Sequence, residues 1–297
     1  MLTSLVLQLK ATHSGGLPAS LGRASQALLL RLVAEQDAAL AATMHDGEGL
    51  RPYTVSNAVI GRRSDGSLRV ETGDTGWVRF TGLTAAVSSV LQAVAAAPPA
   101  SVELDGFPFA VTGTTLDPAI HPWAGQVSYS DLAARHLLAP GVPPRQVRLE
   151  FVAPTTFRRE GRYLPLPLPE LVFGGLLERW QAFAPVALSP EVRRFAAEAV
   201  VISQYDLRSR SLPSKDGGLL IGFTGEVTFS VLNRDRYWLS VLNLLAAYAF
   251  YCGVGYRVTA GLGQVRSVGT TGKPLMGNDR PGIDKETTMP GRGRIRT

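Results

Sequence analysis

The 297-residue chain has a single cysteine, Cys252, and therefore no intramolecular disulfide. A lone cysteine is typical of a reducing compartment, so we expect a cytoplasmic protein. Cysteine and histidine are too few and too scattered for zinc-ligand spacing, and we expect neither a metal nor a cofactor. Residues 1–10 lack the basic start of a signal peptide and alternate like a strand.

Lysine is also scarce, because only 4 of the 30 basic residues are lysine and 26 are arginine. The net charge of +6 and the sequence pI near 9.7 favour an anionic partner such as nucleic acid or a membrane surface. Arginine forks match phosphate oxygens and stack on bases. GC-rich coding explains the same arginine excess, since alanine, glycine and proline are abundant too.

Charge is absent from residues 237–256, which approach transmembrane length. Ser240, Asn243 and the pair Gly253 and Gly255 interrupt this apolar run. We therefore expect a buried core helix, with a membrane-anchored protein as the remote alternative.

The hydrophobic pattern of the first half predicts strand, helix, strand, strand, helix, strand, which is the ferredoxin-like order. We expect strands at 4–10, 52–60, 67–80 and 102–113, helices at 24–35, 38–44 and 84–97, and a strand with a short helix at 123–138. Asp37 is the expected cap of the second helix. The linker is expected at Pro140–Pro144.

The second half repeats this order with two helices in its first crossover. We expect strands at 147–152, 200–208, 219–232 and 264–268, and helices at 170–183, 190–199 and 234–251. The predicted fold class is α+β, with two tandem ferredoxin-like (RRM-like) domains at 1–139 and 145–268. Residues 269–297 lack an apolar period and are expected to form a disordered basic tail.

A glycine-rich loop, Gly253-Val-Gly-Tyr-Arg-Val-Thr-Ala-Gly-Leu-Gly263, follows the charge-free helix. Glycines let backbone N–H groups approach phosphate oxygens, and Arg257 and Arg266 lie in and just after the loop. Val258 excludes a dinucleotide fingerprint, and no Gly-Lys-Ser/Thr closes a P-loop. The alternative is a tight turn packed against its own sheet.

Three segments together resemble the CRISPR-associated endoribonucleases of the RAMP superfamily, which cut repeat RNA to make guide RNAs. They are the glycine loop with the following Gln264 and Val265, the histidine segment 44–56, and 147–158 with Leu166 and Pro167. The resemblance covers the chain from about residue 1 to 268. It implies CRISPR repeat RNA as the partner, contact with other CRISPR effector subunits in some relatives, and either a monomer or a homodimer.

The same resemblance implies metal-independent chemistry, in which the 2′-OH attacks the scissile phosphate and leaves 2′,3′-cyclic phosphate and 5′-OH ends. Histidine suits the proton transfers, and His45 falls on the family's catalytic histidine. Arg51 stands where relatives carry a lysine, so it can stabilise phosphorane charge but cannot shuttle protons. The family's helix tyrosine is replaced here, near Leu30, and His13 is the alternative second proton-transfer group.

Residues expected to hold RNA lie in the glycine loop, at the start of the second domain and in its long hairpin. They are Gly253, Gly255, Tyr256, Arg257, Gly261, Gly263, Gln264, Arg266, Arg158, Arg159, Arg208 and Arg210. His121 and His136 are expected to be structural, and the arginines of the tail could also touch RNA. The retained His45 favours an enzyme, whereas the missing tyrosine favours a non-catalytic RNA-binding subunit of a CRISPR effector complex on the same fold.

Overall fold

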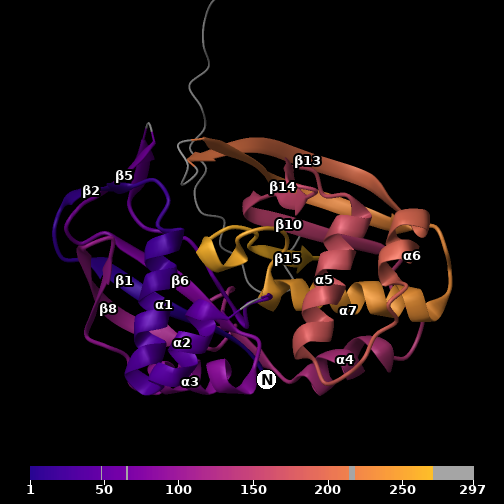
Figure 1. Cartoon of the computed structure of the whole chain (residues 1–297), viewed down its shortest axis with the longest axis horizontal. Coiled ribbons are helices and arrows are strands. Elements are labelled where there is room, and N and C mark those ends of the chain that lie inside the picture. The colour runs from indigo at the N-terminus through magenta and orange to yellow at the C-terminus, as the bar shows by residue number, and fades with distance from the viewer. Residues whose placement is uncertain (48, 65, 214–217, 270–297) are drawn as a thin grey trace, which may run out of the picture.

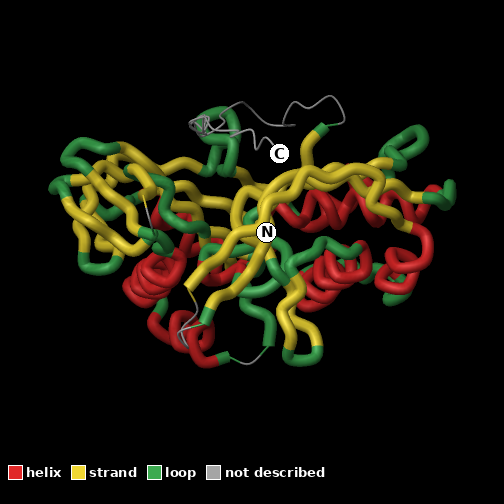
Figure 2. Tube along the Cα trace, turned by 90° about the horizontal axis from the view of Figure 1, so that it is seen from above, coloured by secondary structure: helices red, strands yellow, loops and turns green. Residues whose placement is uncertain are grey.

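A computed structural model describes residues 1–47, 49–64, 66–213 and 218–269, so the expected tail lies outside the described residues from position 270 onward. Two sheets, each with its own helices, lie side by side (Figure 1). Figure 2 shows the strands gathered on one side of the molecule and most helices on the other. The fold is therefore a mixed α+β structure.

The first sheet has the order β3-β6-β1-β8-β7, with β9 paired to the start of β1. Its strands are β1 (Leu2–Ala11), β3 (Tyr53–Val55), β6 (Thr75–Gly82), β7 (Ser101–Leu104), β8 (Phe107–Thr115) and β9 (Gly125–Val127). Its helices are α1 (Gly22–Gln36), α2 (Ala38–Asp46) and α3 (Ala85–Ala96). As expected, Leu28, Leu29, Leu32 and Val33 form the buried face of α1.

The prediction of one strand at 67–80 is wrong, because these residues form two strands that belong to two different sheets. A three-stranded sheet contains β2 (Gly15–Pro18), β5 (Ser67–Val70) and β4 (Arg62–Ser64), and the chain then turns before β6. Gly73 has φ of 93° in that turn, and the Asp74 carboxylate accepts a hydrogen bond from the backbone N–H of Glu71. The turn residues override the alternating pattern around them.

The second sheet has the order β13-β14-β10-β15. Its strands are β10 (Gln146–Thr155), β13 (Val200–Pro213), β14 (Leu219–Val231) and β15 (Val265–Val268), with a separate hairpin of β11 (Phe157–Arg159) and β12 (Arg162–Leu164). Its helices are α4 (Tyr129–Leu137), α5 (Pro169–Phe183), α6 (Val192–Ala199), α7 (Arg236–Cys252) and the short 3₁₀ helix η1 (Val258–Ala260).

Helix α7 is the central helix of the second core. Its buried residues include Leu242, Leu245 and Tyr248, and the Asp235 side chain accepts hydrogen bonds from two N–H groups of its first turn. The charge-free run is thus a core helix, and no helix in the described ranges is long and apolar enough to cross a membrane. Helix α4 precedes the expected linker, but its Tyr129 and Leu132 share this core.

The first sheet caps the C-terminal end of α7. The carbonyl of Tyr251 accepts hydrogen bonds from the Thr81 hydroxyl at 2.8 Å and the Thr54 hydroxyl at 3.4 Å. The carbonyl of Phe250 accepts one from the Arg79 guanidinium. The last carbonyls of a helix have no partner inside it, so these side chains satisfy groups that would otherwise be buried unpaired.

Arg79 is 3% exposed, although it carries a charge. Its Nε donates to the Ser4 hydroxyl at 2.7 Å and to the Trp123 carbonyl at 3.1 Å. The guanidinium lies between two rings, 5.1 Å from the centre of Trp123 and 4.4 Å from that of Phe250. A buried cation that is hydrogen-bonded through Nε and Nη2 and stacked between two rings therefore joins the two units.

Candidate functional site

His45 lies in the last turn of α2, where its side chain is 72% exposed. The Asp37 side chain starts this helix by accepting a hydrogen bond from the N–H of Leu40 at 2.9 Å, as the sequence predicts. The Nδ1 atom of His45 lies 2.6 Å from a carboxylate oxygen of Asp46. An ionised carboxylate can only accept, so Nδ1 carries the proton and Nε2 is left with its lone pair in the neutral ring.

Arg51 folds back over the end of α2. Its guanidinium donates to the carbonyl of His45 at 3.0 Å and to the carbonyl of Gly47. A cation at a helix C-terminus is stabilised by the helix dipole. Arg51 therefore fixes the backbone of the His45 turn, and its guanidinium lies next to the histidine's main chain.

Tyr53 follows closely, but it is fully buried. Its hydroxyl accepts a hydrogen bond from the Gln26 side chain at 2.9 Å, and burial raises the pKa of this phenol. A buried, protonated phenol has no access to substrate. Within the described ranges, no group of three or more histidine, cysteine, aspartate or glutamate side chains is arranged to hold a metal ion.

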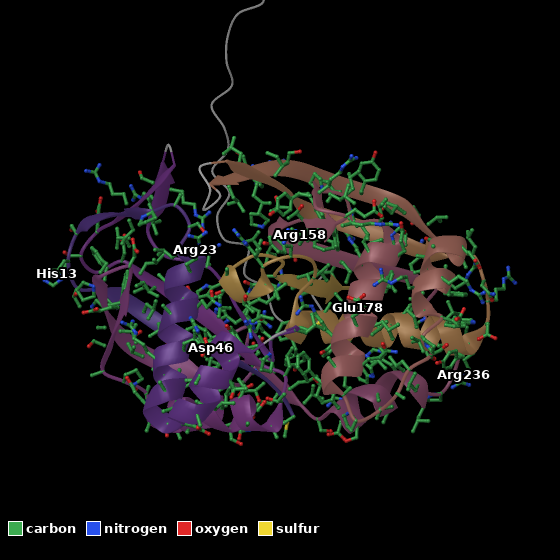
Figure 3. The ribbon with its side chains drawn as sticks, in the orientation of Figure 1. His13, Arg23, Asp46, Arg158, Glu178 and Arg236 are labelled. Atoms are coloured by element: carbon green, nitrogen blue, oxygen red, sulfur yellow. The ribbon has the colours of Figure 1, made fainter. Side chains whose placement is uncertain are left out.

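The structure does not bring His13 to His45. His13 follows the end of β1. At the other end of β1, Thr3 pairs with Gly82 on β6, and Gly82 also pairs with Tyr53 at the start of β3. A ten-residue strand is about 30 Å long. Figure 3 accordingly shows His13 at the outer border of the first unit and Asp46 on its inner side.

The four glycines of the loop all have positive φ. The values are 65° at Gly253, 86° at Gly255, 85° at Gly261 and 69° at Gly263. A Cβ on Gly255 would lie 2.5 Å from the carbonyl oxygen of Thr156, and one on Gly263 would lie 2.1 Å from that of Val254. These glycines allow the loop to pack against the protein's own backbone.

Most of the loop's backbone donors are already used. Six N–H groups, those of residues 253, 254, 256, 260, 262 and 263, donate to backbone carbonyls of the protein. The six bonds fit a tight turn packed against its own sheet, which is the alternative expected from the sequence. Successive N–H groups without a partner among the hydrogen bonds of the described residues are left at 257–259, so the expected phosphate concavity is narrowed to that segment and stays a prediction.

The glycine loop also lies against the first unit. Asn57 donates to the carbonyl of Gly261 at 3.2 Å, and Ser56 forms a β-bridge with the same glycine. A Cβ on Gly22, at the start of α1, would lie 2.0 Å from the carbonyl oxygen of Ala260. The exposed Arg23 follows directly, so this arginine stands beside the loop (Figure 3).

Tyr256 is the centre of a basic and aromatic cluster on the loop. Its ring lies 5.5 Å from the ring of Tyr163, and the guanidinium carbons of Arg257 and Arg158 lie 5.2 and 6.0 Å from its centre. Burial alone would raise the pKa of Tyr256. Hydrogen bonds to Arg257 and Tyr163 and the charges of the two arginines outweigh burial, so the pKa is lowered.

The β11–β12 hairpin contributes Arg158 and Tyr163, which face each other across it, and the register pair Arg159 and Arg162. All four are exposed. The two-residue loop between them has positive φ at Glu160 and Gly161, as in a type I′ turn. The turn residues in the sequence could have indicated that Tyr163 pairs with Arg158. Arg162, Tyr163, Arg23 and Asp46 were not among the site residues predicted from the sequence.

Arg266 and Gln264 are not placed to touch RNA. The Arg266 guanidinium pairs with the Glu150 carboxylate at 2.7 Å, lies 5.2 Å from the Trp123 ring centre and is 12% exposed. Gln264 is 8% exposed. These contacts do not support direct RNA binding by either side chain, and strand pairing with β10 is what places Arg266 against Glu150.

Arg208 and Arg210 lie on β13, in the second sheet, and both are exposed. No hydrogen bond, ion pair or ring contact of the described residues brings either arginine to the cluster around Tyr256.

The two histidines that are expected to be structural lie elsewhere. His121 packs its ring edge against Trp77, with 4.9 Å between ring centres. Burial lowers the pKa of His136, and the charge of Arg135 acts in the same direction.

Comparison with known proteins matches residues 149–265 to the model of a family described as CRISPR-associated endoribonuclease Cas6. A curated protein of that name from Mycobacterium tuberculosis is 30% identical over 123 residues, which is 41% of this chain and 38% of the relative. The match to the curated relatives thus spans less than two-fifths of their length.

Solved structures extend the similarity to most of the chain. One Cas6 product complex is 29% identical with a TM-score of 0.70, and a second is 25% identical with a TM-score of 0.74. Each comparison covers 90% of this chain and 99% of the solved one. The predicted resemblance to the CRISPR-associated repeat-RNA processing endoribonucleases is therefore confirmed, and the α+β fold matches that of Cas6 structures.

Proposed function

We propose that this chain, as a relative of the CRISPR-associated Cas6 endoribonucleases, cuts CRISPR precursor transcripts within the repeat to make guide RNAs. The observation that carries the proposal is an exposed histidine, oriented by Asp46, at the end of α2. On this proposal the two sheets are tandem ferredoxin-like domains at residues 1–139 and 145–268, with α4 at the end of the first range packed into the core of the second domain. No metal ion or cofactor takes part.

His45 acts as the general base. Its Nε2 takes the proton of the 2′-OH while that oxygen attacks the adjacent phosphorus, and the bond to the 5′-oxygen breaks. The products are a 2′,3′-cyclic phosphate and a 5′-OH, whose proton comes from water or from the imidazolium. Asp46 positions the ring by accepting a hydrogen bond from Nδ1–H, with 2.6 Å between nitrogen and oxygen, and its negative charge favours the imidazolium that forms.

Arg51 fixes the backbone of the His45 turn and offers donors to the reacting phosphate. Two of its nitrogens hold the carbonyls of His45 and Gly47, which leaves other N–H groups of the five-donor guanidinium for a phosphorane oxygen. His13 is excluded from the proposed catalytic pair because β1 separates it from His45. The catalytic group is thus one histidine with two supporting residues.

RNA is held by side chains around the glycine loop. Tyr256 and Tyr163 offer ring faces for bases, since base–aromatic stacking tolerates any sequence. The guanidinium groups of Arg158, Arg257 and Arg23 bind phosphates next to them. The loop joins the two units, so RNA bound there passes from the second unit toward α1 and α2 of the first.

The non-catalytic RNA-binding subunit remains the second candidate. One observation favours it: among the described residues, Asp46 is the only side chain with a hydrogen bond or ion pair to the His45 ring. A second proton-transfer group beside the ring would favour the enzyme.

The test is cutting of end-labelled repeat RNA from the source genome, in EDTA, by the wild type and by His45→Ala. We expect one cut with a cyclic phosphate end and a rate lowered at least about 100-fold in the variant. His13→Ala is the matched control, since it removes another exposed histidine of the same unit, and should cut normally. A 2′-deoxy nucleotide before the cut should abolish cleavage.

Equal cutting by wild type and His45→Ala would refute the assigned site, and loss of cutting in His13→Ala would move it to His13. Tight binding without cutting by the wild type would favour the non-catalytic subunit. Cutting that disappears in EDTA and returns with magnesium would refute the metal-independent mechanism.

A further inference from the structure

The small sheet of β2, β5 and β4 has one face on the first core and one face in solvent. Leu17 on β2 and Leu68 and Val70 on β5 are buried in the core of the first unit. Antiparallel partners lie on the same face, so Arg63, which is opposite Leu68, belongs to this inner side. Figure 1 shows β5 at one end of the first unit, above the start of α1.

Two arginines lie opposite each other on the outer face. Arg62 on β4 and Arg69 on β5 are direct partners in the register, and both are exposed. Neither guanidinium has a hydrogen bond or an ion pair within the described part of the chain. None of the three strands contains an aspartate or glutamate, and Glu71, just after β5, forms no ion pair with Arg69 among the described residues. Like charges directly opposite each other destabilise a sheet, and an anion bound between them would remove that repulsion.

Open space lies beside this pair of arginines. Gly16 on β2 is opposite Arg69, and a Cβ on Gly16 would have no atom within 4 Å. The row across the sheet is therefore glycine, arginine, arginine, and no side chain of β2 covers Arg69. Because nothing encloses the row, it suits an extended polyanion better than a small ion. Arginine forks match the oxygens of phosphate groups.

The row is continuous with the surface around the glycine loop. Pro18, the last residue of β2, pairs with Ser67 on β5, and α1 starts four residues later at Gly22. Arg23 is five residues from Pro18, so their Cα atoms are at most about 18 Å apart. Arg23 stands beside the glycine loop, where the proposed function holds RNA (Figure 3). A strand of RNA that leaves the loop past Arg23 can reach the small sheet.

We propose that Arg62 and Arg69 bind the phosphate backbone of RNA that extends beyond the segment held at the glycine loop. This RNA is the transcript of the proposed function, on which the proposal rests. Each guanidinium pairs with the phosphate of one nucleotide and reads no base, so the contact is independent of sequence. It adds affinity and lengthens the bound segment, and it takes no part in the cut at His45.

The test measures RNA binding by the His45→Ala protein, in which binding is separated from cutting. The probes are the labelled repeat alone and the repeat extended at its 5′ end or at its 3′ end. We expect one extended RNA to bind more tightly than the repeat, and Arg62→Ala with Arg69→Ala to raise its Kd at least about fivefold. The slope of log K against log salt should become shallower by about 1.4, since each phosphate contact with a single strand contributes about 0.7.

Two control variants separate the arginine pair from net charge and from folding. Arg62→Lys with Arg69→Lys retains both charges and should retain most of the salt slope. Arg194→Ala with Arg234→Ala removes the same charge from exposed positions of the second unit and should leave Kd within about twofold. All the replaced side chains are exposed, so Tm should stay within about 2 °C of the parent protein.

Three results would overturn the proposal: no gain in affinity on extending the repeat, an unchanged salt slope without the two arginines, or an equal loss in the Arg194 and Arg234 control. Its failure is distinct from that of the proposed function. If the protein with His45 intact cuts the repeat and the arginine variant binds normally, only the arginine pair is wrong. If it does not cut, but loss of the arginines weakens binding as expected, the proposed function fails and the arginine pair stands. A protein that binds no RNA would overturn both.

Discussion

Replacement of Arg79 by methionine should destabilise the protein and loosen the glycine loop. Methionine retains the length of the side chain but donates no hydrogen bond. The carbonyl of Phe250 would lose its cap, and the carbonyl of Trp123 would retain only the hydroxyl of Ser4. Each buried group left unpaired costs about 1–3 kcal/mol.

Part of this loss is recovered, because the variant no longer buries a charge. Burial lowers the pKa of Arg79 to about 9, which shows that the site disfavours the charged form although the residue is still protonated at neutral pH. No carboxylate of the described residues forms an ion pair with Arg79, so the hydrogen bonds and the two rings must stabilise its charge. We expect a net destabilisation of about 2–4 kcal/mol, or a fall in Tm of about 5–15 °C for a chain of this size.

Thermal unfolding measures the loss of stability in Arg79→Met, and hydrogen exchange measures the loosening of the glycine loop. Exchange should quicken at residues 250–263, which include the capped carbonyls, more than in α6, which packs against α5 and β13 of the second unit. Arg69→Met is the control, since Arg69 is an exposed arginine of the first unit and its loss should leave Tm within about 2 °C. If both variants unfold at the same temperature, Arg79 does not join the two units as described.

Three further changes test the site and its surroundings. Gly255→Ala should lower stability by about 1–3 kcal/mol, because φ is 86° and the new Cβ meets the Thr156 carbonyl. Gly175→Ala in α5 is the control, since a Cβ there has open space and the change should be neutral or slightly stabilising. Chemical denaturation of the two variants measures the difference in unfolding free energy. Asp46→Asn should slow RNA cutting about tenfold or more without weakening RNA binding, and Asp46→Glu should recover part of the rate; weakened binding instead would make Asp46 an RNA contact. Burial lowers the pKa of His136, so the unfolded chain binds a proton that the folded chain rejects, and stability should fall as pH drops through the unfolded pKa near about 6.5. His136→Gln should lose less stability than the wild type between about pH 7 and pH 5, and identical pH dependence would contradict this reasoning.

Features set by neighbouring residues were predictable from the sequence. Asp37 caps α2, and the apolar stripe of α1 is buried, because capping and helical spacing act within a few residues. The positive φ of the loop glycines follows from the same local logic.

Features set by distant partners were not predictable. Arg266 reads as a free cation until β15 pairs with β10 and sets it against Glu150. Arg79 reads as an ordinary strand residue until α7 brings the Phe250 carbonyl to it from 171 positions away. His13 reads as a second catalytic histidine until β1 is seen to separate it from His45. In each case the deciding contact comes from another element of the fold.

The capping of α7 by the first sheet limits how the two halves can be exchanged between relatives. A recombination event in the linker at 140–144 would give a chimera whose α7 comes from one parent and whose Arg79 and Thr81 come from the other. Such a chimera is viable only if the foreign sheet still offers donors to the carbonyls of residues 250 and 251. The recognisable family segment at 149–265 is therefore not a freely movable module, and its inheritance should follow that of the strand at 75–82.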